Sequence, residues 1–170
     1  MNGLIHDLLA LAKMDEGQTN IIRNSFNLSN EVLNTTLEFE SCVFEERKKY
    51  TYDIKENIIF IGDEKQIKQL VTILIDNAIR YSEEKGVIEV SLSKDRNHIC
   101  ISVFNTGVGV PDEERKKIFE RFYRTDESRS RETGGYGVGL SIAKSIVEMH
   151  KGKIAVTGEY LKWIRFDVIL

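Results

Sequence analysis

Cysteine and proline are scarce in this sequence, since its 170 residues include two cysteines and one proline. Cys42 and Cys100 lie far apart and form no CxxC pair, which favours two reduced cytosolic thiols over a disulfide framework or a zinc site. The three histidines, His6, His98 and His150, show no metal-ligand spacing either. We therefore do not expect a fold that is held together by disulfide bonds or by bound metal ions.

A basic excess and a long apolar run are also missing. The formal net charge is −3 and the pI is near 5.7, which argues against a nucleic-acid binder. No stretch approaches the ~18 consecutive apolar residues of a membrane span, and no N-terminal signal is visible. We expect no nucleic-acid partner and no direct membrane contact from this stretch of chain.

The composition suits one ordinary domain with a real core, because 41% of the residues are hydrophobic. The glycines are unevenly placed, and half of the 12 fall in one short stretch that also holds the only proline. These residues are Gly107, Gly109, Gly134, Gly135, Gly137, Gly139 and Pro111.

Hydrophobic periodicity predicts an alternation of helices and strands. Helices are expected over residues 2–16, 30–48, 64–82 and 138–150, and strands over residues 25–28, 50–54, 57–61, 87–93, 98–104, 153–157 and 163–169. Ser29 and Asp63 are predicted helix caps, and residues 94–97 are predicted to join two antiparallel strands. The pattern favours an α+β fold, a two-layer sandwich in which helices cover one face of a mostly antiparallel sheet.

The helix over 64–82 carries a candidate polar site. A helical wheel places Ile67, Leu70 and Leu74 on one buried stripe, with Asn77 at its edge and Asp76 on the solvated back. The carboxamide oxygen of Asn77 suits a hard cation such as Mg²⁺, which binds few protein oxygens together with phosphates. The alternative is an asparagine that only hydrogen-bonds at a helix edge.

Two glycine-rich turns could approach a ligand. Asn105 is predicted to lead a turn after a strand that ends at Phe104, and Gly107 and Gly109 permit positive φ there. The segment 134–143 opens a helix whose free N–H groups could hold phosphate. It matches neither GxGxxG nor the Walker A pattern. Ordinary strand-to-helix turns are the alternative for both.

The segment 118–124 (IFERFYR) repeats apolar residues at helical spacing, which predicts a patch that anchors to the core. The surrounding run is rich in charges of both signs and indicates a solvated face. Arg124 and Arg129 precede the glycines and could reach a phosphate.

The order of these four segments, from Gly62 to Gly152, resembles the N, G1, F and G2 boxes of sensor histidine kinases. The F-box segment distinguishes that family from gyrase, the Hsp90 chaperones and MutL within the same ATPase superfamily. The resemblance implies a Bergerat-type fold and γ-phosphoryl transfer from ATP to a histidine. It also implies Mg²⁺ as the metal.

The resemblance implies a role for each matching residue. Asn77 would be the catalytic Mg²⁺ ligand, and Asn105 would receive the adenine amino group. The other implied nucleotide-binding residues are Arg80, Tyr81, Gly107, Gly109, Val110, Arg124, Arg129, Gly135, Gly137, Val138, Gly139 and Leu140. Residues 111–136 would form the ATP lid.

This sequence departs from the family pattern at three places. Asn105 stands where aspartate is usual, Ile73 stands where a second asparagine is frequent, and Trp163-Ile164 replaces a Gly-Thr pair. An amide oxygen without full charge makes a weaker hydrogen bond, so adenine selectivity is expected to be reduced.

The resemblance also implies a division of the chain. Residues 1–17 would end the second helix of a dimerisation domain, 18–24 would be a linker, and 25–170 the catalytic ATP-binding domain. His6 lacks the proline that follows a phosphoacceptor, so we expect that this chain cannot autophosphorylate. The expected partners are the acceptor-histidine helix of its own kinase and, indirectly, a response regulator. The expected setting is the cytoplasmic side of a membrane-anchored homodimeric sensor.

Two other functions remain open from the residues. One is a non-catalytic nucleotide-sensing or interaction module, which the three departures would favour. The other is a non-kinase ATPase of the same superfamily, which would hydrolyse ATP without an acceptor.

Overall fold

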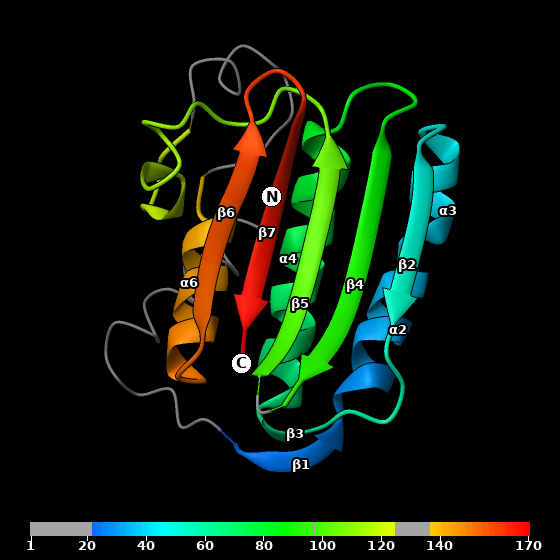
Figure 1. Ribbon diagram of the computed structural model, residues 1–170, viewed down its shortest axis with the longest axis vertical. Helices are drawn as coiled ribbons and strands as arrows, with labels where there is room; N and C mark the ends of the chain where they lie inside the picture. The colour runs from blue at the N-terminus through cyan, green and yellow to red at the C-terminus, as the bar shows by residue number, and fades with distance from the viewer. Residues whose placement is uncertain (1–21, 97, 125–136) are drawn as a thin grey trace, which may run out of the picture.

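The computed structural model describes residues 22–96, 98–124 and 137–170, which form two layers (Figure 1). The predicted helix over 2–16 and most of the predicted linker lie outside these residues, as do Arg129 and Gly135. The main layer is a five-stranded sheet in the order β2-β4-β5-β7-β6. Its strands are β2 (Lys49–Ile54), β4 (Val87–Asp95), β5 (His98–Thr106), β6 (Lys153–Glu159) and β7 (Trp163–Ile169).

The predicted α+β sandwich is confirmed, and the sheet is mixed. β2 pairs with β4 in parallel, while the β4–β5, β5–β7 and β6–β7 pairs are antiparallel. The predicted hairpin between β4 and β5 is present. A separate two-stranded ribbon pairs β1 (Asn24–Asn27) with β3 (Ile59–Gly62) at one end of the molecule (Figure 1).

Three helices cover one face of the sheet: α2 (Leu28–Glu38), α4 (Glu64–Tyr81) and α6 (Gly139–Met149) (Figure 1). Alternate residues of the strands point into this interface, as in β5, where Ile99, Ile101 and Val103 are buried. The core is therefore a layer of aliphatic side chains between sheet and helices. No helix in the described part of the chain is long and apolar enough to cross a membrane.

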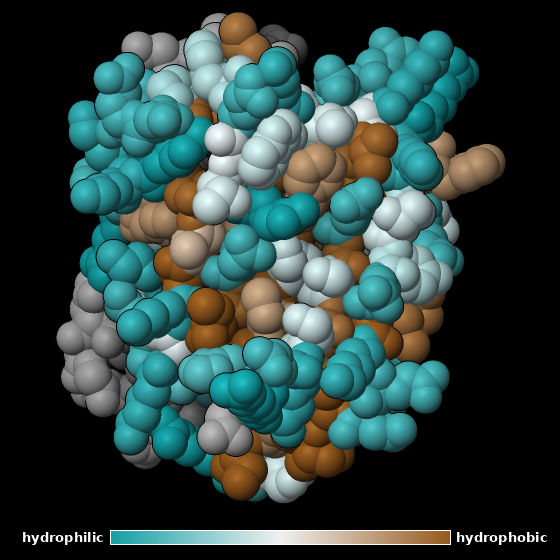
Figure 2. Space-filling view, viewed as in Figure 1, coloured by the Kyte–Doolittle hydropathy of each residue, from teal (hydrophilic) through white to brown (hydrophobic). Residues whose placement is uncertain are grey.

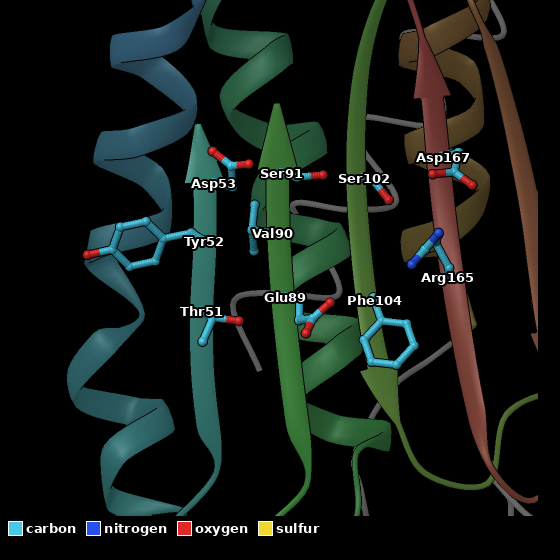
Figure 3. A pocket seen from close by; sticks show the side chains of 10 residues that line it. All are labelled: Thr51, Tyr52, Asp53, Glu89, Val90, Ser91, Ser102, Phe104, Arg165 and Asp167. Atoms are coloured by element: carbon cyan, nitrogen blue, oxygen red, sulfur yellow. The ribbon is translucent and has the colours of Figure 1, made fainter. Parts of the chain in front are cut away.

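In the part of the chain that the structure describes, the other face of the sheet carries no helix, and hydrophilic, intermediate and hydrophobic side chains are mixed on it (Figure 2). A concavity of about 450 Å³ lies there, lined by residues of β2, β4, β5 and β7 (Figure 3). Its lining includes Asp53, Glu89 and Asp167, and the Arg165 guanidinium lies 5.6 Å from the centroid of the Phe104 ring. The surface is a solvated one with mixed charge.

The helix predicted over 30–48 is wrong in its start and its continuity. Asn27 caps α2 by accepting from the Asn30 N–H, whereas Ser29 is buried inside the helix. The Ser29 hydroxyl donates to the Lys55 carbonyl (2.6 Å) and accepts from the Ile58 N–H (2.9 Å), so it joins α2 to the turn between β2 and β3. α2 ends at Phe39, its C-cap residue, and a separate α3 (Glu40–Glu45) follows.

The segment 118–124 repeats apolar residues at helical spacing but does not form an α-helix. Turns surround a short 3₁₀ helix, η1 (Lys117–Phe119). Ile118 is buried, and the Phe119 ring meets the Phe166 ring edge to face at 6.2 Å. Phe122 is 61% exposed, with φ of +62°. The predicted anchoring is thus confirmed for Ile118, Phe119 and Tyr123 and wrong for Phe122.

Candidate functional site

The four segments singled out in the sequence come together along the second half of α4. The residue after α4, Ser82, forms a β-bridge with Gly107 at the end of β5. The Phe122 N–H donates to the Gly137 carbonyl (2.9 Å), which brings the end of the η1 segment to the start of α6. A Cβ built on Gly139 would lie 3.5 Å from a methyl carbon of Ile73 on α4. Segments distant in sequence therefore surround one place in the fold.

α4 begins where the sequence predicts, and Asp63 is its cap. The Asp63 carboxylate accepts from the backbone N–H groups of Lys65 (3.1 Å) and Gln66 (3.2 Å). The predicted buried stripe is confirmed, and its members are Ile67, Leu70, Val71, Leu74 and Ala78. Asn77 lies half-buried at the edge of that stripe. The helix thus holds the amide at the margin between core and solvent.

Arg80 and Tyr81 occupy the last turn of α4. The Arg80 Nε donates to the Asp76 carboxylate (2.7 Å), an ion pair between side chains that are each about two-fifths exposed. Tyr81 is half-buried, and its carbonyl oxygen lies against Gly107. Arg80 is therefore held along the helix surface by Asp76, close to the position of Asn77.

Asn105 is the most unusual polar residue of the site. β5 continues to Thr106, so the predicted strand end at Phe104 is wrong, because Asn105 pairs with both Ile88 of β4 and Ile164 of β7. It takes a core-facing position and is 1% exposed. Its Nδ2 donates to the Thr106 carbonyl (3.0 Å), but its Oδ1 is buried with no hydrogen-bond partner. A buried acceptor in this state suits a ligand that brings an N–H donor.

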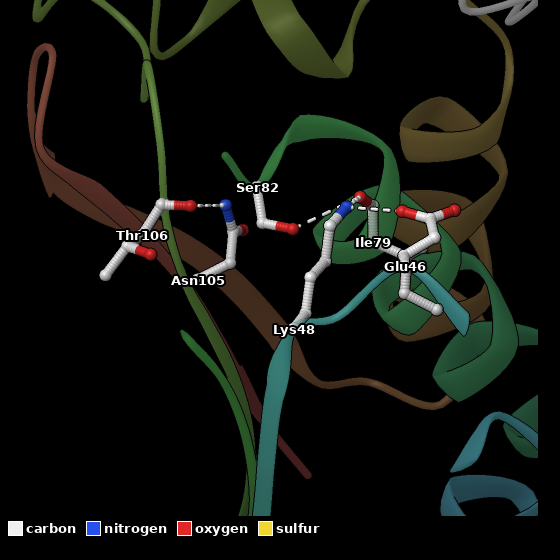
Figure 4. Close-up of polar contacts among 6 residues, drawn as sticks. All are labelled: Glu46, Lys48, Ile79, Ser82, Asn105 and Thr106. Carbon is white, nitrogen blue, oxygen red and sulfur yellow. Dashed lines mark hydrogen bonds and ion pairs between the residues drawn. The ribbon is translucent and has the colours of Figure 1, made fainter. Parts of the chain in front are cut away.

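Sequence reasoning missed a lysine beside this asparagine. Lys48, whose side chain is only 7% exposed, pairs with Glu46 (2.6 Å) and donates to the Ile79 carbonyl near the end of α4 (Figure 4). The Ser82 hydroxyl donates to the same carbonyl (3.2 Å). A cation at a helix C-terminus is favourable. The lysine sits in a run of basic residues, so its sequence context resembles that of an exposed one.

Gly107 and Gly109 are required by close backbone approach. Gly107 has φ of +144°, and a Cβ there would lie 2.3 Å from the Tyr81 carbonyl oxygen. Gly109 has φ of +62°, and its Cβ would lie 3.0 Å from the Trp163 carbonyl oxygen. Val110, which follows, is half-buried against the core. These residues join β5 to both α4 and the β6–β7 hairpin.

The start of α6 presents backbone rather than side chains. Gly137 has φ of +73°, and Val138, the N-cap residue, is buried and makes no side-chain cap hydrogen bond. Gly139 and Leu140 form the first turn and are half-exposed. Such a helix N-terminus favours an anion, because its N–H groups and dipole both point outward. Arg124 lies half-buried just before the break in the described chain.

Carboxylates, thiols and imidazoles do not gather into a metal centre in the described residues. No group of three or more His, Cys, Asp or Glu side chains that could hold a metal ion is found among residues 22–96, 98–124 and 137–170. Asn77 on α4 carries an amide oxygen and is half-buried.

The sequence matches the family model of histidine kinase-, DNA gyrase B- and HSP90-like ATPases over residues 62–170. It is 36% identical to the sensor protein CiaH of Streptococcus pneumoniae over 99% of this chain and 37% of that protein. It is 40% identical to the sensor histidine kinase YkoH of Bacillus subtilis over 92% of this chain and 33% of that protein. The chain thus spans about a third of the length of these curated relatives.

Solved structures show the same fold. The catalytic domain of the histidine kinase ThkA matches with a TM-score of 0.77 and 26% identity, over 87% of this chain and 94% of that one. Full-length ShkA in complex with AMPPNP matches with a TM-score of 0.84 and 21% identity, over 98% of this chain and 34% of that one. The chain belongs to the histidine kinase-, DNA gyrase B- and HSP90-like ATPase family, as an ATP-binding catalytic domain of the sensor histidine kinase type.

Proposed function

We propose that this domain positions ATP for transfer of its γ-phosphoryl group to a histidine on a dimerisation domain of the same kinase. The observation that carries the proposal is the buried, unpaired Oδ1 of Asn105. Adenine offers an exocyclic N–H donor at its C6 amino group, which this acceptor would receive. Guanine has a carbonyl oxygen at C6, which would face Oδ1 as a second acceptor and be rejected. The site therefore fits an adenine base.

The phosphates would extend from the base toward the start of α6. The backbone N–H groups at the start of α6, those of Gly137, Val138, Gly139 and Leu140, would hold the phosphates. Arg80, Arg124 and Arg129 would add charge, and Tyr81, Gly109 and Val110 would border the nucleotide. Gly135 and the lid over 111–136 complete the proposed site. For the residues that the structure describes, the support is their placement around α4, and for Arg129 and Gly135 it is the family pattern of the sequence.

Mg²⁺ would be bound jointly by the phosphates and the Asn77 amide oxygen. A single protein oxygen suits Mg²⁺, which keeps several waters and phosphate oxygens as ligands. When bound, the metal would neutralise charge on the transferring group. The chain's own part is to hold the reactants in line, which accounts for a large share of catalysis in phosphoryl transfer.

The acceptor histidine would come from outside the described residues. Residues 1–17 would end a dimerisation helix and 18–24 would link it to the domain, in a homodimeric sensor that passes phosphate to a response regulator. The ThkA kinase has been solved in complex with the response regulator protein TrrA, which supports a partner of this kind. The proposed setting is the cytoplasmic side of a membrane-anchored sensor, supported by relatives named as sensor proteins.

The binding step is tested with a fluorescent ATP analogue. Asn77→Ala should weaken Mg²⁺-dependent binding about tenfold or more, because the metal loses its protein oxygen. Asn34→Ala is the matched control, since Asn34 is an exposed asparagine on α2. Equal affinities for Asn77→Ala and the control would remove Asn77 from the proposed metal site.

The transfer step needs a separate acceptor. We expect no stable label on this chain incubated with γ-labelled ATP, and label on an added dimerisation domain that carries the acceptor helix. Tight ATP binding with no transfer would favour a nucleotide-sensing module, and steady ATP hydrolysis without an acceptor would favour another ATPase. Stable phosphohistidine on His6 would overturn the assignment of residues 1–17.

A further inference from the structure

Lys48 is a nearly buried cation that lies just before β2 and caps α4. Its side chain is 7% exposed, and its ammonium group donates to the Ile79 carbonyl in the last turn of α4 (Figure 4). The last carbonyls of a helix have no partner within the helix, and a cation is favoured at that end. Because Lys48 lies 31 positions before Ile79, the cap comes from a different element of the fold.

The charge of Lys48 is already engaged in this position. Glu46 lies 2.6 Å from the Lys48 Nζ, and the side chain of Glu46 is 47% exposed. The carboxylate and the helix C-terminus together offset the cost of burying the ammonium group. The lysine is therefore a bridge between the two, and it acts through the elements that it joins rather than directly on a ligand.

The end of α4 is joined directly to the strand that carries Asn105. The Ser82 hydroxyl donates to the same Ile79 carbonyl (3.2 Å), and Ser82 forms a β-bridge with Gly107. Gly107 follows Asn105 by two residues, just after the end of β5. The carbonyl that Lys48 caps is therefore connected, through this bridge, to the residue with the unpaired Oδ1.

Thr106 links the orientation of the Asn105 amide to the loop between α4 and β4. The Thr106 carbonyl accepts from Asn105 Nδ2 (3.0 Å), which leaves Oδ1 as the unpaired end of the amide. The Thr106 hydroxyl accepts from the N–H of Val87, the first residue of β4 (2.9 Å). This loop begins at the end of α4 that Lys48 caps, so one connected set of contacts holds both the lysine and the amide.

We propose that Lys48 is a positioning residue for base recognition, because its bond to the Ile79 carbonyl holds the end of α4 against β5 and so sets the place of the Asn105 Oδ1. This rests on the proposed function, in which Asn105 receives the adenine amino group. The start of α6, which would hold the phosphates, is anchored separately by the hydrogen bond from Phe122 to Gly137. Loss of the lysine contact should therefore weaken binding of the base more than binding of the phosphates.

The test uses the full chain and substitutions at two neighbouring lysines. Lys48→Met keeps an unbranched stem and removes the charge and its donors, while Lys48→Arg keeps a charge and N–H donors. Lys48→Gln takes the place of Lys48→Met if the methionine variant does not fold, because its polar end is one bond shorter than that of lysine. Lys49→Met is the matched control, since Lys49 is exposed at the start of β2.

Three competitors displace a fluorescent ATP analogue in the presence of Mg²⁺: ATP, GTP and inorganic triphosphate. All affinities are measured below the melting temperature of every variant, so that only folded protein is compared. The ratio of the ATP and GTP affinities reports recognition of the base, and the triphosphate affinity reports the phosphate end of the site alone.

We expect Lys48→Met to bind ATP about threefold to tenfold more weakly, the range of one lost hydrogen bond, and to lose its preference for ATP over GTP by a similar factor. Its triphosphate affinity should stay within about twofold of that of the unsubstituted chain. Lys48→Arg should restore the ATP affinity to within about threefold, and Lys49→Met should change none of the three affinities by more than about twofold. The NMR signal of the Asn105 side-chain amide should shift in Lys48→Met and stay in place in Lys49→Met.

Several results would overturn the inference. One is a Lys48→Met protein that melts at a lower temperature but keeps its preference for ATP over GTP, since that is the mark of a purely structural lysine. Another is an equal loss of affinity for ATP and for triphosphate. If the unsubstituted chain binds neither nucleotide, the proposed function fails. In that case the Asn105 side-chain amide signal still decides whether Lys48 holds the junction of α4 and β5.

Discussion

At the scale of single residues, Asn105 combines a cost in stability with the role in base recognition that we propose for it. An unpaired acceptor buried in the core costs about 1–3 kcal/mol, and a ligand donor would recover that energy. The sequence predicted this residue's role from the family pattern, but placed it in a turn. Its strand position depends on Ile88 and Ile164 from two neighbouring strands, and pairing between distant segments leaves no local signal.

Asn105→Leu should separate these two effects. We expect the free energy of unfolding in urea to stay level or rise by about 1 kcal/mol, since the orphaned oxygen is removed. We also expect the preference for ATP over GTP to vanish in competition binding. Ser102→Ala on the solvent side of the same strand should change neither quantity. A leucine variant that still discriminates the two nucleotides would show that the base is recognised elsewhere.

At the scale of elements, the sequence predicted α4 best. Its N-cap aspartate and its apolar stripe are both local patterns, and both are confirmed. The break at Phe39 between α2 and α3 has no such signal, because the flanking residues continue a helical periodicity. The 118–124 segment shows the opposite case. Its apolar residues have helical spacing, but Ile118 and Phe119 reach the core from a single 3₁₀ turn between other turns rather than from an α-helix.

The junction of α4 and β5 should depend on Gly107 having no side chain. Gly107→Ala would place a methyl group 2.3 Å from the Tyr81 carbonyl oxygen at φ of +144°. We expect a loss of about 2–4 kcal/mol in the free energy of unfolding, measured in urea. Gly139→Ala is the control, because its methyl group would meet Ile73 at an ordinary 3.5 Å. Equal free energies of unfolding for Gly107→Ala and Gly139→Ala would mean that the junction accommodates the added methyl group with no loss of stability.

At the scale of the whole molecule, the matched family segment is smaller than the folding unit. The match begins at residue 62, yet Leu28 and Val32 of α2 are fully buried and β2 completes the sheet beside β4. The sequence predicted these elements but not that β2 runs parallel to β4, because a period of two is the same in both directions.

A fragment of residues 62–170 should therefore fail to fold. It would expose the faces of α4 and β4 that α2 and β2 cover, and leave β4 as an open edge. Circular dichroism and amide NMR should show a collapsed or aggregated chain. Residues 22–170 should instead give a dispersed NMR spectrum and a cooperative unfolding transition. A folded 62–170 fragment would mean that the first forty described residues are an accessory layer.

The hydrogen bond from the Phe122 N–H to the Gly137 carbonyl also bears on what holds the start of α6 in place. It is made by backbone atoms alone, so it needs no particular side chain at Phe122. The first turn of α6 is therefore anchored twice, by the backbone that follows η1 and by the buried side chains of the helix itself.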